Sequence, residues 1–172
     1  MNTILLLFST ALVLRLASLV KSVSNEKRLL KVNATEYGRK NSVALVLAHT
    51  VYYISCITEA VWQKNTVNPV SYIGAGLFIF SMIMLWMVIL SLGKVWTVKL
   101  IIAPQHTVNK SFLFKYFRHP NYFLNIIPEL VALALICQAW FTLLIGLPVY
   151  LIPLTIRIIQ EEKVMKAHFK NY

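Results

Sequence analysis

The chain has 172 residues, of which 58% are hydrophobic and only 13% are charged, and its formal net charge is +11. A soluble domain is usually about 25% charged, and one of this length could not bury so much apolar surface. The composition therefore excludes a soluble globular domain and indicates an integral membrane protein with several spans. In such a protein the positive charge is expected in cytoplasmic loops beside anionic lipid, and no motif for reading nucleic acid is present.

The two cysteines, Cys56 and Cys137, both lie inside apolar runs. We interpret them as buried, reduced packing residues without a disulfide or metal role. No pair of residues has the spacing of metal ligands, so no metal site is predicted. The N-terminus has no basic segment before its first apolar run, so this run is expected to be a retained span and not a signal peptide.

The hydropathy pattern predicts an all-α fold with five transmembrane helices. The predicted spans are residues 3–20, 42–62, 70–92, 121–137 and 139–159. Arg15 lies in the last third of the first span, where a long side chain can reach the lipid headgroups. Gln138 is expected in a tight turn, and the prolines are expected to bend the last two spans. These prolines are Pro128, Pro148 and Pro153.

The loops between the spans differ in charge, and this difference predicts the orientation. Residues 21–41 form a polar loop with six Lys or Arg residues. Five more lie in 94–118, an interfacial stretch too polar to cross the membrane, and four lie in 157–170. The turn at 63–69 has one. The positive-inside rule then places the N-terminus outside and the C-terminus in the cytoplasm.

The segment Arg118-His119-Pro120-Asn121-Tyr122 closes a basic loop and opens an apolar helix. Proline is suited to the first position of a helix, and it keeps the preceding residue extended. The free N–H groups of Asn121 and Tyr122 would then lie at the positive end of the helix dipole, where an anion can bind. The alternative interpretation is a basic loop that only holds the helix at the headgroups, with Arg118 extending to them.

The C-terminal tail is predicted to be helical, with lysines on one face and polar groups on the other. At about 100° per residue, the second face contains Arg157, Glu161 and His168, while Glu162 lies on its flank. Two explanations are open. Arg157 and Glu161 can pair within the helix at i,i+4, or the face can contribute to a polar site near the loop with His119.

Other ionisable or polar residues lie within the spans, where such groups are costly and frequently functional. Glu129 follows Pro128 deep in the fourth span, and Asn125 lies one turn before it. Glu59 is near the outer end of the second span and is expected to be solvated. His49 is expected to be a packing residue.

Several spaced motifs in the C-terminal half resemble the isoprenylcysteine carboxyl methyltransferase family, whose members are membrane enzymes that use S-adenosylmethionine. The motifs are Leu92-Gly93, His106, Arg118-His119-Pro120-x-Tyr122, Arg157-x-x-x-Glu161-Glu162, and Phe169-x-x-Tyr172. The N-terminal half resembles a small bacterial branch that methylates alkylpyrone-type phenolic lipids. The residues concerned there are 25–28 and 36–38.

This resemblance implies a single transmembrane domain over residues 1–172, with three spans in 1–92 and a catalytic half in 93–172. It also implies a cofactor pocket on the cytoplasmic side, reached by a lipophilic substrate from the bilayer, and a bacterial cell membrane as the location. The cofactor-binding residues would be His106, Arg118, His119, Pro120, Tyr122 and Asn125. The catalytic residues would be Arg157 and Glu162 or Glu161. The acceptor could be a carboxylate, as in isoprenylcysteine, or an alkylpyrone hydroxyl.

Two other functions remain open at this stage. Sterol and enone reductases of the membrane have a similar C-terminal half and use NADPH, although this chain is short for one and shows no added basic cluster. A non-enzymatic assembly or transport subunit is also possible, with Arg118, Glu129 and Arg157 pairing only inside a bundle. Nothing in the sequence indicates an oligomeric state.

Overall fold

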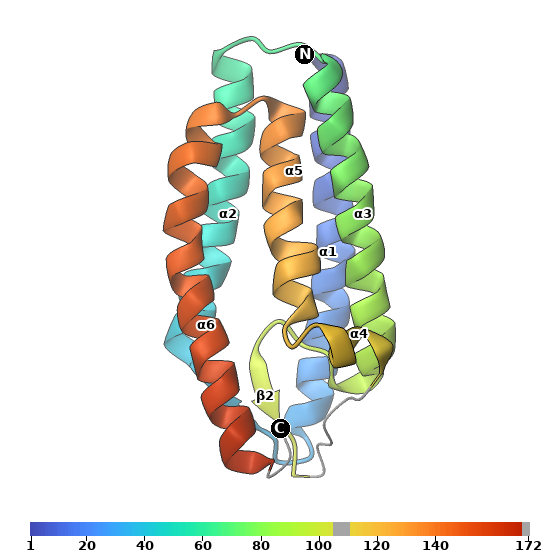
Figure 1. The fold of residues 1–172 in the computed structure, drawn as a ribbon, viewed down its shortest axis with the longest axis vertical. Helices are drawn as coiled ribbons and strands as arrows, with labels where there is room; N and C mark the ends of the chain where they lie inside the picture. Colours follow the sequence, from blue (N-terminus) through green and yellow to red (C-terminus); the bar gives the residue numbers. More distant parts are fainter. Residues whose placement is uncertain (105–110, 170–172) are drawn as a thin grey trace.

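The computed structural model describes residues 1–104 and 111–169, and its long helices run side by side in one elongated bundle (Figure 1). The long helices are α1 (Asn2–Leu30), α2 (Arg39–Trp62), α3 (Pro69–Leu92), α5 (Ile127–Cys137) and α6 (Leu147–His168). The short helical segments are η1 (Gly93–Val95), α4 (Phe112–Tyr116), η2 (Asn121–Ile126) and η3 (Thr142–Gly146). The strands are β1 (Thr35–Tyr37) and β2 (Leu100–Ile102).

Helix length and composition confirm an all-α membrane protein. Within residues 1–104 and 111–169, four helical segments are long and apolar enough to cross a bilayer, namely Asn2–Leu30, Arg39–Trp62, Pro69–Val95 and Thr142–His168. A shorter apolar helix covers Asn121–Cys137, the predicted fourth span. The N-terminus and the end of α6 lie at opposite ends of the bundle (Figure 1), as an odd number of crossings requires. Five crossings and their orientation stay predictions.

The outer surface of the bundle is apolar, whereas its centre is closely packed. Leu6, Leu90 and Leu144 are each at least two-thirds exposed, which suits side chains that face lipid. In the interior, α3 and α5 approach so closely at Gly74 that a Cβ there would lie 2.7 Å from the backbone nitrogen of Ile136. Small residues at such contacts are typical of membrane helix packing.

Helix α1 continues to Leu30, so the prediction that the first helix gives way to a polar loop near residue 20 is wrong. The extension has a buried polar face that pairs with the segment after α3. Asn25 donates to the carbonyl oxygens of Gly93 (3.0 Å) and Trp96 (2.8 Å), and Ser22 accepts from the N–H of Val98 (2.8 Å). The polar residues of this extension can therefore remain helical, because the segment after α3 supplies their hydrogen-bonding partners.

A two-stranded antiparallel sheet is the exception to the all-α prediction, and it joins the two polar loops. Glu36 of β1 is opposite Ile101 of β2. Lys99, just before β2, lies 2.5 Å from Glu26 and 3.7 Å from Glu36. The hydrogen bond to Glu26 is the main reason why the pKa of Lys99 is raised. The sheet thus connects α1, the loop before α2 and the predicted interfacial stretch. These segments meet at the end of the bundle where α6 ends, and we call this the basic end.

The prolines coincide with changes in helix geometry at two of the three predicted places. π-Helical turns, η2 and η3, come immediately before the helices that begin around Pro128 and Pro148, whereas α6 continues through Pro153. Proline lacks the N–H of the regular ladder, and π turns are one way to accommodate the loss. Gln138 has the left-handed conformation (φ 54°) and forms the predicted tight turn.

Glu59 is buried, so the prediction that it is solvated is wrong. Its carboxylate accepts hydrogen bonds from the backbone N–H groups of Phe141 and Thr142, both at 2.9 Å, and from the Thr142 hydroxyl at 2.8 Å. The first N–H groups of a helix have no partner within that helix. The carboxylate of Glu59, on α2, is the partner for these N–H groups and so caps the helical segment that begins with η3.

Candidate functional site

A cluster of polar side chains lies at the basic end, where the start of η2 meets the last turns of α6. We call it the end cluster, and it consists of His119, Tyr122, Arg157, Glu161 and Glu162. The carbonyl oxygen of His119 accepts from the N–H groups of Tyr122 (3.1 Å) and Phe123 (3.3 Å). The Tyr122 N–H is therefore engaged, and the prediction that it is free for an anion is wrong.

His119 is held between the two acids of α6. Its Nδ1 lies 3.4 Å from Glu161 and its Nε2 lies 3.5 Å from Glu162. The ring is 5% exposed and stacks on Tyr122 with centroids 5.7 Å apart. The Tyr122 hydroxyl donates to Glu161. Both acids that the sequence left as alternatives therefore reach the same histidine, one from each side.

The electrostatics of the cluster favour a protonated histidine. Burial by itself lowers the pKa of His119, but the carboxylates of Glu161 and Glu162 oppose it, and the net pKa is raised. The two nitrogens form no well-aligned hydrogen bond although both are buried. The ion pairs are also longer than the about 2.8 Å of a charge-assisted hydrogen bond. The ring can therefore take up a further hydrogen-bonding partner without losing a strong existing one.

Arg157 lies beside this group and is only 2% exposed. Its guanidinium donates to the Ser42 hydroxyl (2.9 Å) and to the carbonyl oxygen of Val98 (2.7 Å). The intrahelical pair of Arg157 with Glu161, one of the two explanations that the sequence left open, is not formed. Ser42 and Val98 were not predicted, and no local pattern indicates them, because both belong to segments distant in sequence from α6.

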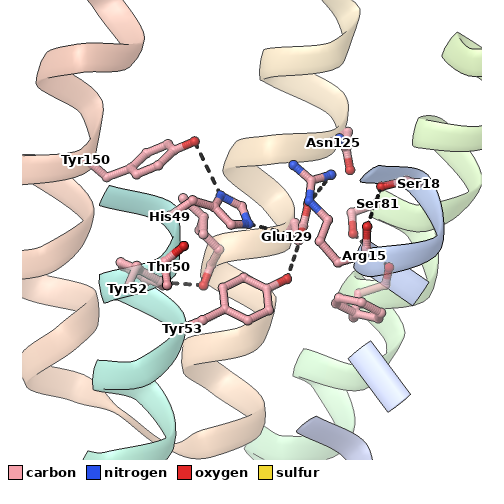
Figure 2. A network of polar contacts seen from close by, with 12 residues as sticks. Arg15, Ser18, His49, Thr50, Tyr52, Tyr53, Ser81, Asn125, Glu129 and Tyr150 are labelled. Atoms are coloured by element: carbon pink, nitrogen blue, oxygen red, sulfur yellow. Dashed lines mark hydrogen bonds and ion pairs between the residues drawn. The ribbon is translucent and has the colours of Figure 1, made fainter. Parts of the chain in front are cut away.

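The other predicted site residues are distributed differently. Pro120 is buried beside His119, whereas Arg118 is exposed at the surface of the basic end. Asn125 is fully buried one turn after Asn121, to whose side chain it donates (3.1 Å), and Figure 2 shows it in the polar network around Arg15 and Glu129. His106 lies outside the described residues.

A small hollow of about 170 Å³ opens at the basic end, next to the end of α6. Tyr37, Ile102, Pro104 and His168 line it, and the Tyr37 hydroxyl lies 3.1 Å from His168. The loop after β1 also touches α6, because a Cβ on Gly38 would lie 2.3 Å from the Gln160 side-chain oxygen. The hollow lies at the same end of the bundle as the end cluster, but the residues of the end cluster do not line it.

A second polar group lies in the middle of the bundle (Figure 2), and we call it the central network. Glu129 is fully buried, 3.2 Å from Arg15 and 3.7 Å from His49, and it accepts a 2.5 Å hydrogen bond from Tyr53. His49 in turn lies 3.5 Å from the Tyr150 hydroxyl. Arg15 therefore reaches inward to an acid and not outward to the headgroups, which corrects the prediction for it.

Among residues 1–104 and 111–169, no group of three histidine, cysteine or acidic side chains could hold a metal ion. The end cluster offers instead two carboxylates, a histidine between them and a buried guanidinium. Two carboxylates near one histidine can balance an additional cationic group, and a carboxylate can accept a proton. The fold and this cluster define a membrane protein with a polar site suited to a charged ligand at one end of an apolar bundle.

Comparison with known proteins gives the family. The model of the isoprenylcysteine carboxyl methyltransferase (ICMT) family matches residues 74–167, more than half of the chain. The chain belongs to this family of membrane methyltransferases. It is 49% identical over 162 residues to an uncharacterized protein of Haemophilus influenzae, covering 94% of each chain. It is 27% identical to the uncharacterized protein YpbQ of Bacillus subtilis, covering 95% of this chain and 96% of the relative. No solved structure matches.

Proposed function

We propose that the protein transfers a methyl group from S-adenosylmethionine to an oxygen of a lipophilic acceptor. The observation that carries the proposal is the convergence of His119, Glu161 and Glu162 from two distant segments at one end of an ICMT-family bundle. The acceptor would be a carboxylate of the isoprenylcysteine type or an alkylpyrone hydroxyl. By the positive-inside rule the basic end would face the cytoplasm of a bacterial cell.

The described residues fit this cofactor. Arg118 is exposed at the same end of the bundle, so its charge is available for the methionyl carboxylate, and His119 would line the methionyl end of the cofactor. Glu161 and Glu162 are 26% and 32% exposed and can balance a sulfonium charge. Tyr122 would orient Glu161. When bound, S-adenosylmethionine supplies an electrophilic methyl group, and the C–S bond breaks with its electron pair left on sulfur as the new C–O bond forms.

The protein's own part is to position the acceptor and to exclude water. Arg157 is buried and anchored by Ser42 and Val98, so its charge is in place to orient an anionic carboxylate or enolate oxygen. An acceptor that arrives as a neutral hydroxyl must lose a proton, and Glu162 would accept it. One carboxylate oxygen of Glu162 lies 3.2 Å from Lys166, and the other oxygen faces His119. Methyl transfer of this kind requires no metal.

Binding and turnover in detergent test the proposal together. Isothermal titration should show S-adenosylhomocysteine binding at micromolar concentration or below and no binding of NADPH. NADPH binding instead would support a reductase, and binding of neither nucleotide would support an assembly subunit. Methyl-labelled S-adenosylmethionine should transfer label to an alkylpyrone or to a farnesylated cysteine derivative.

Variants of the end cluster then show which of the two acids takes part in methyl transfer. His119→Ala and Glu162→Ala should each lower turnover at least about 100-fold while the protein stays folded. Glu161→Ala is the matched comparison, because Glu161 lies on the other side of the same ring. Lys166→Ala is the control for Glu162, since it removes only that acid's exposed partner. Wild-type turnover in a variant would remove its residue from the site.

A further inference from the structure

An apolar groove runs along the lipid-facing side of the bundle between α2 and the helix formed by η3 and α6. Its volume is about 310 Å³. Val51 and Ser55 of α2 line one side, and Ile145 and Val149 line the other. Val51, Ile145 and Val149 are each more than half exposed, so the groove is open to the hydrocarbon of the bilayer. None of the described residues that line it is charged.

Polar contacts inside the bundle fix the two aromatic walls of this groove. Tyr52 donates its hydroxyl to the carbonyl oxygen of Leu130 (3.2 Å), and the Tyr150 hydroxyl lies 3.5 Å from His49 in the central network (Figure 2). Both hydroxyls are thus engaged with interior partners, while the two residues also line the groove. A cavity whose aromatic walls are held in this way is pre-formed for a ligand.

Gly146 keeps the groove wide at its centre. A Cβ at this position would lie 3.2 Å from the ring of Tyr52, closer than ordinary van der Waals contact. Any larger side chain at this position of η3 would therefore press on the Tyr52 wall and narrow the space between the helices. The absence of a side chain at Gly146 thus keeps the groove open.

The groove follows the same helix pair that holds Arg157. Helices α2 and α6 lie next to each other (Figure 1), and Arg157 of α6 donates to Ser42 of α2 at the basic end. Tyr150 comes seven residues before Arg157, about 10 Å along the helix, and the groove continues to Thr142, about 12 Å further. A ligand with its polar head at Arg157 would have its chain directed along this helix pair.

We propose that this groove binds the far part of a single hydrocarbon chain of the methyl acceptor and so selects acceptors by chain length. The inference rests on the proposed function. A volume of 310 Å³ holds about ten methylene groups if each takes roughly the 30 Å³ of a water molecule. An extended chain advances about 1.25 Å per carbon, so about 10 carbons also span the length of the groove. A chain that extends from Arg157 to the far end of the groove would have about 18 carbons.

Two further observations favour this occupant over a bilayer phospholipid. The space fits one chain and not two, and no charged side chain among the described lining residues could hold a phosphate headgroup.

The test uses Ser55→Phe, which fills the groove, with Ile54→Phe as its matched control, because Ile54 is 58% exposed and does not line the groove. Both variants and the wild type are reconstituted in phosphatidylethanolamine and phosphatidylglycerol vesicles. The acceptors are 4-hydroxy-6-alkyl-2-pyrones with short (about 7-carbon) or long (about 17-carbon) chains. Ser55→Phe should lower kcat/KM about tenfold for the long acceptor and leave the short one unchanged. Ile54→Phe should change neither.

Two kinetic outcomes would overturn the proposal. One is an equal kcat/KM for the long acceptor in the Ser55→Phe and Ile54→Phe variants. The other is a loss by Ser55→Phe that is equal for short and long acceptors, because chain-length selection is the claim.

Photolabelling gives a readout that does not depend on turnover. A long-chain pyrone with a diazirine near the end of its chain should label residues 48–55 and 141–150. Label spread over the lipid faces of α1 and α3 would overturn the groove proposal even if methyl transfer occurs. Label in the groove without any methyl transfer would leave the groove in place and refute the proposed function instead.

Discussion

The end cluster and the central network are built from the same residue types but differ in how deeply their acids are buried. In the central network Glu129 is fully buried and has Arg15 at 3.2 Å and Tyr53 at 2.5 Å. In the end cluster His119 lies 3.4 Å from Glu161 and 3.5 Å from Glu162, and both acids are partly exposed. The acid is therefore enclosed in one region, whereas both acids are accessible in the other.

The difference separates a structural role from a functional one. A charge in the middle of a bilayer is stable only when it is paired and hydrogen-bonded, and such a pair has no capacity left for a ligand. A binding site needs groups that can exchange partners, which requires access to water and contacts that are not yet optimal. By this criterion the end cluster is the candidate site and the central network holds α1, α2, α5 and α6 together.

The largest expected effect comes from breaking the central ion pair. Arg15→Met or Glu129→Met alone leaves one unpaired charge in the bundle and should cost about 3–5 kcal/mol of stability. The double variant should cost clearly less than the sum of the two, because no charge is left unpaired. Denaturant titration in micelles measures this. Lys21→Met, which removes an exposed charge from the same helix, is the control. Additive losses would mean that the two residues do not interact.

A smaller effect is expected from the cap at the other end of the bundle. Glu59→Ala removes the acceptor for the Phe141 and Thr142 N–H groups and should cost about 2 kcal/mol. Gln63→Ala is the control, since it removes only a neighbouring donor to the same acid. Thermal unfolding measures the loss. Affinity for S-adenosylhomocysteine should not change, because Glu59 lies at the end opposite the candidate site, and a weakened affinity would contradict the separation of the two regions.

The smallest effect concerns the protonation of His119. Its pKa is raised in the folded protein, so its pairing with the acids stabilises the fold below the unfolded value near 6.5 and is lost as the pH rises through the folded pKa. The melting temperature of wild type should therefore exceed that of His119→Asn at about pH 6, and the two should converge by about pH 9. We expect no more than about 1 kcal/mol. A gap that does not vary with pH would show that His119 is not charged.

Much of the candidate site could be predicted from local motifs. His119, Tyr122, Glu161 and Glu162 were identified from the sequence, and the structure brings all four together although they belong to two segments. The partners of these groups could not be predicted in the same way. For Arg157 the sequence left open a pair within its own helix or a place in a polar site, but its guanidinium reaches Ser42 and Val98, because the geometry of three segments decides which acceptor lies closest.

The sequence by itself determined that the protein belongs in a membrane, which apolar stretches form helices and which residues form the motif. Hydropathy over about 20 residues is a local property, so it can be summed along the chain. Only the tertiary structure decided what each buried polar group pairs with: Arg15 turned inward to Glu129, and Glu59 became a helix cap. A charge in lipid must find a partner, but the identity of that partner depends on which neighbouring helix presents one, and that is a property of packing.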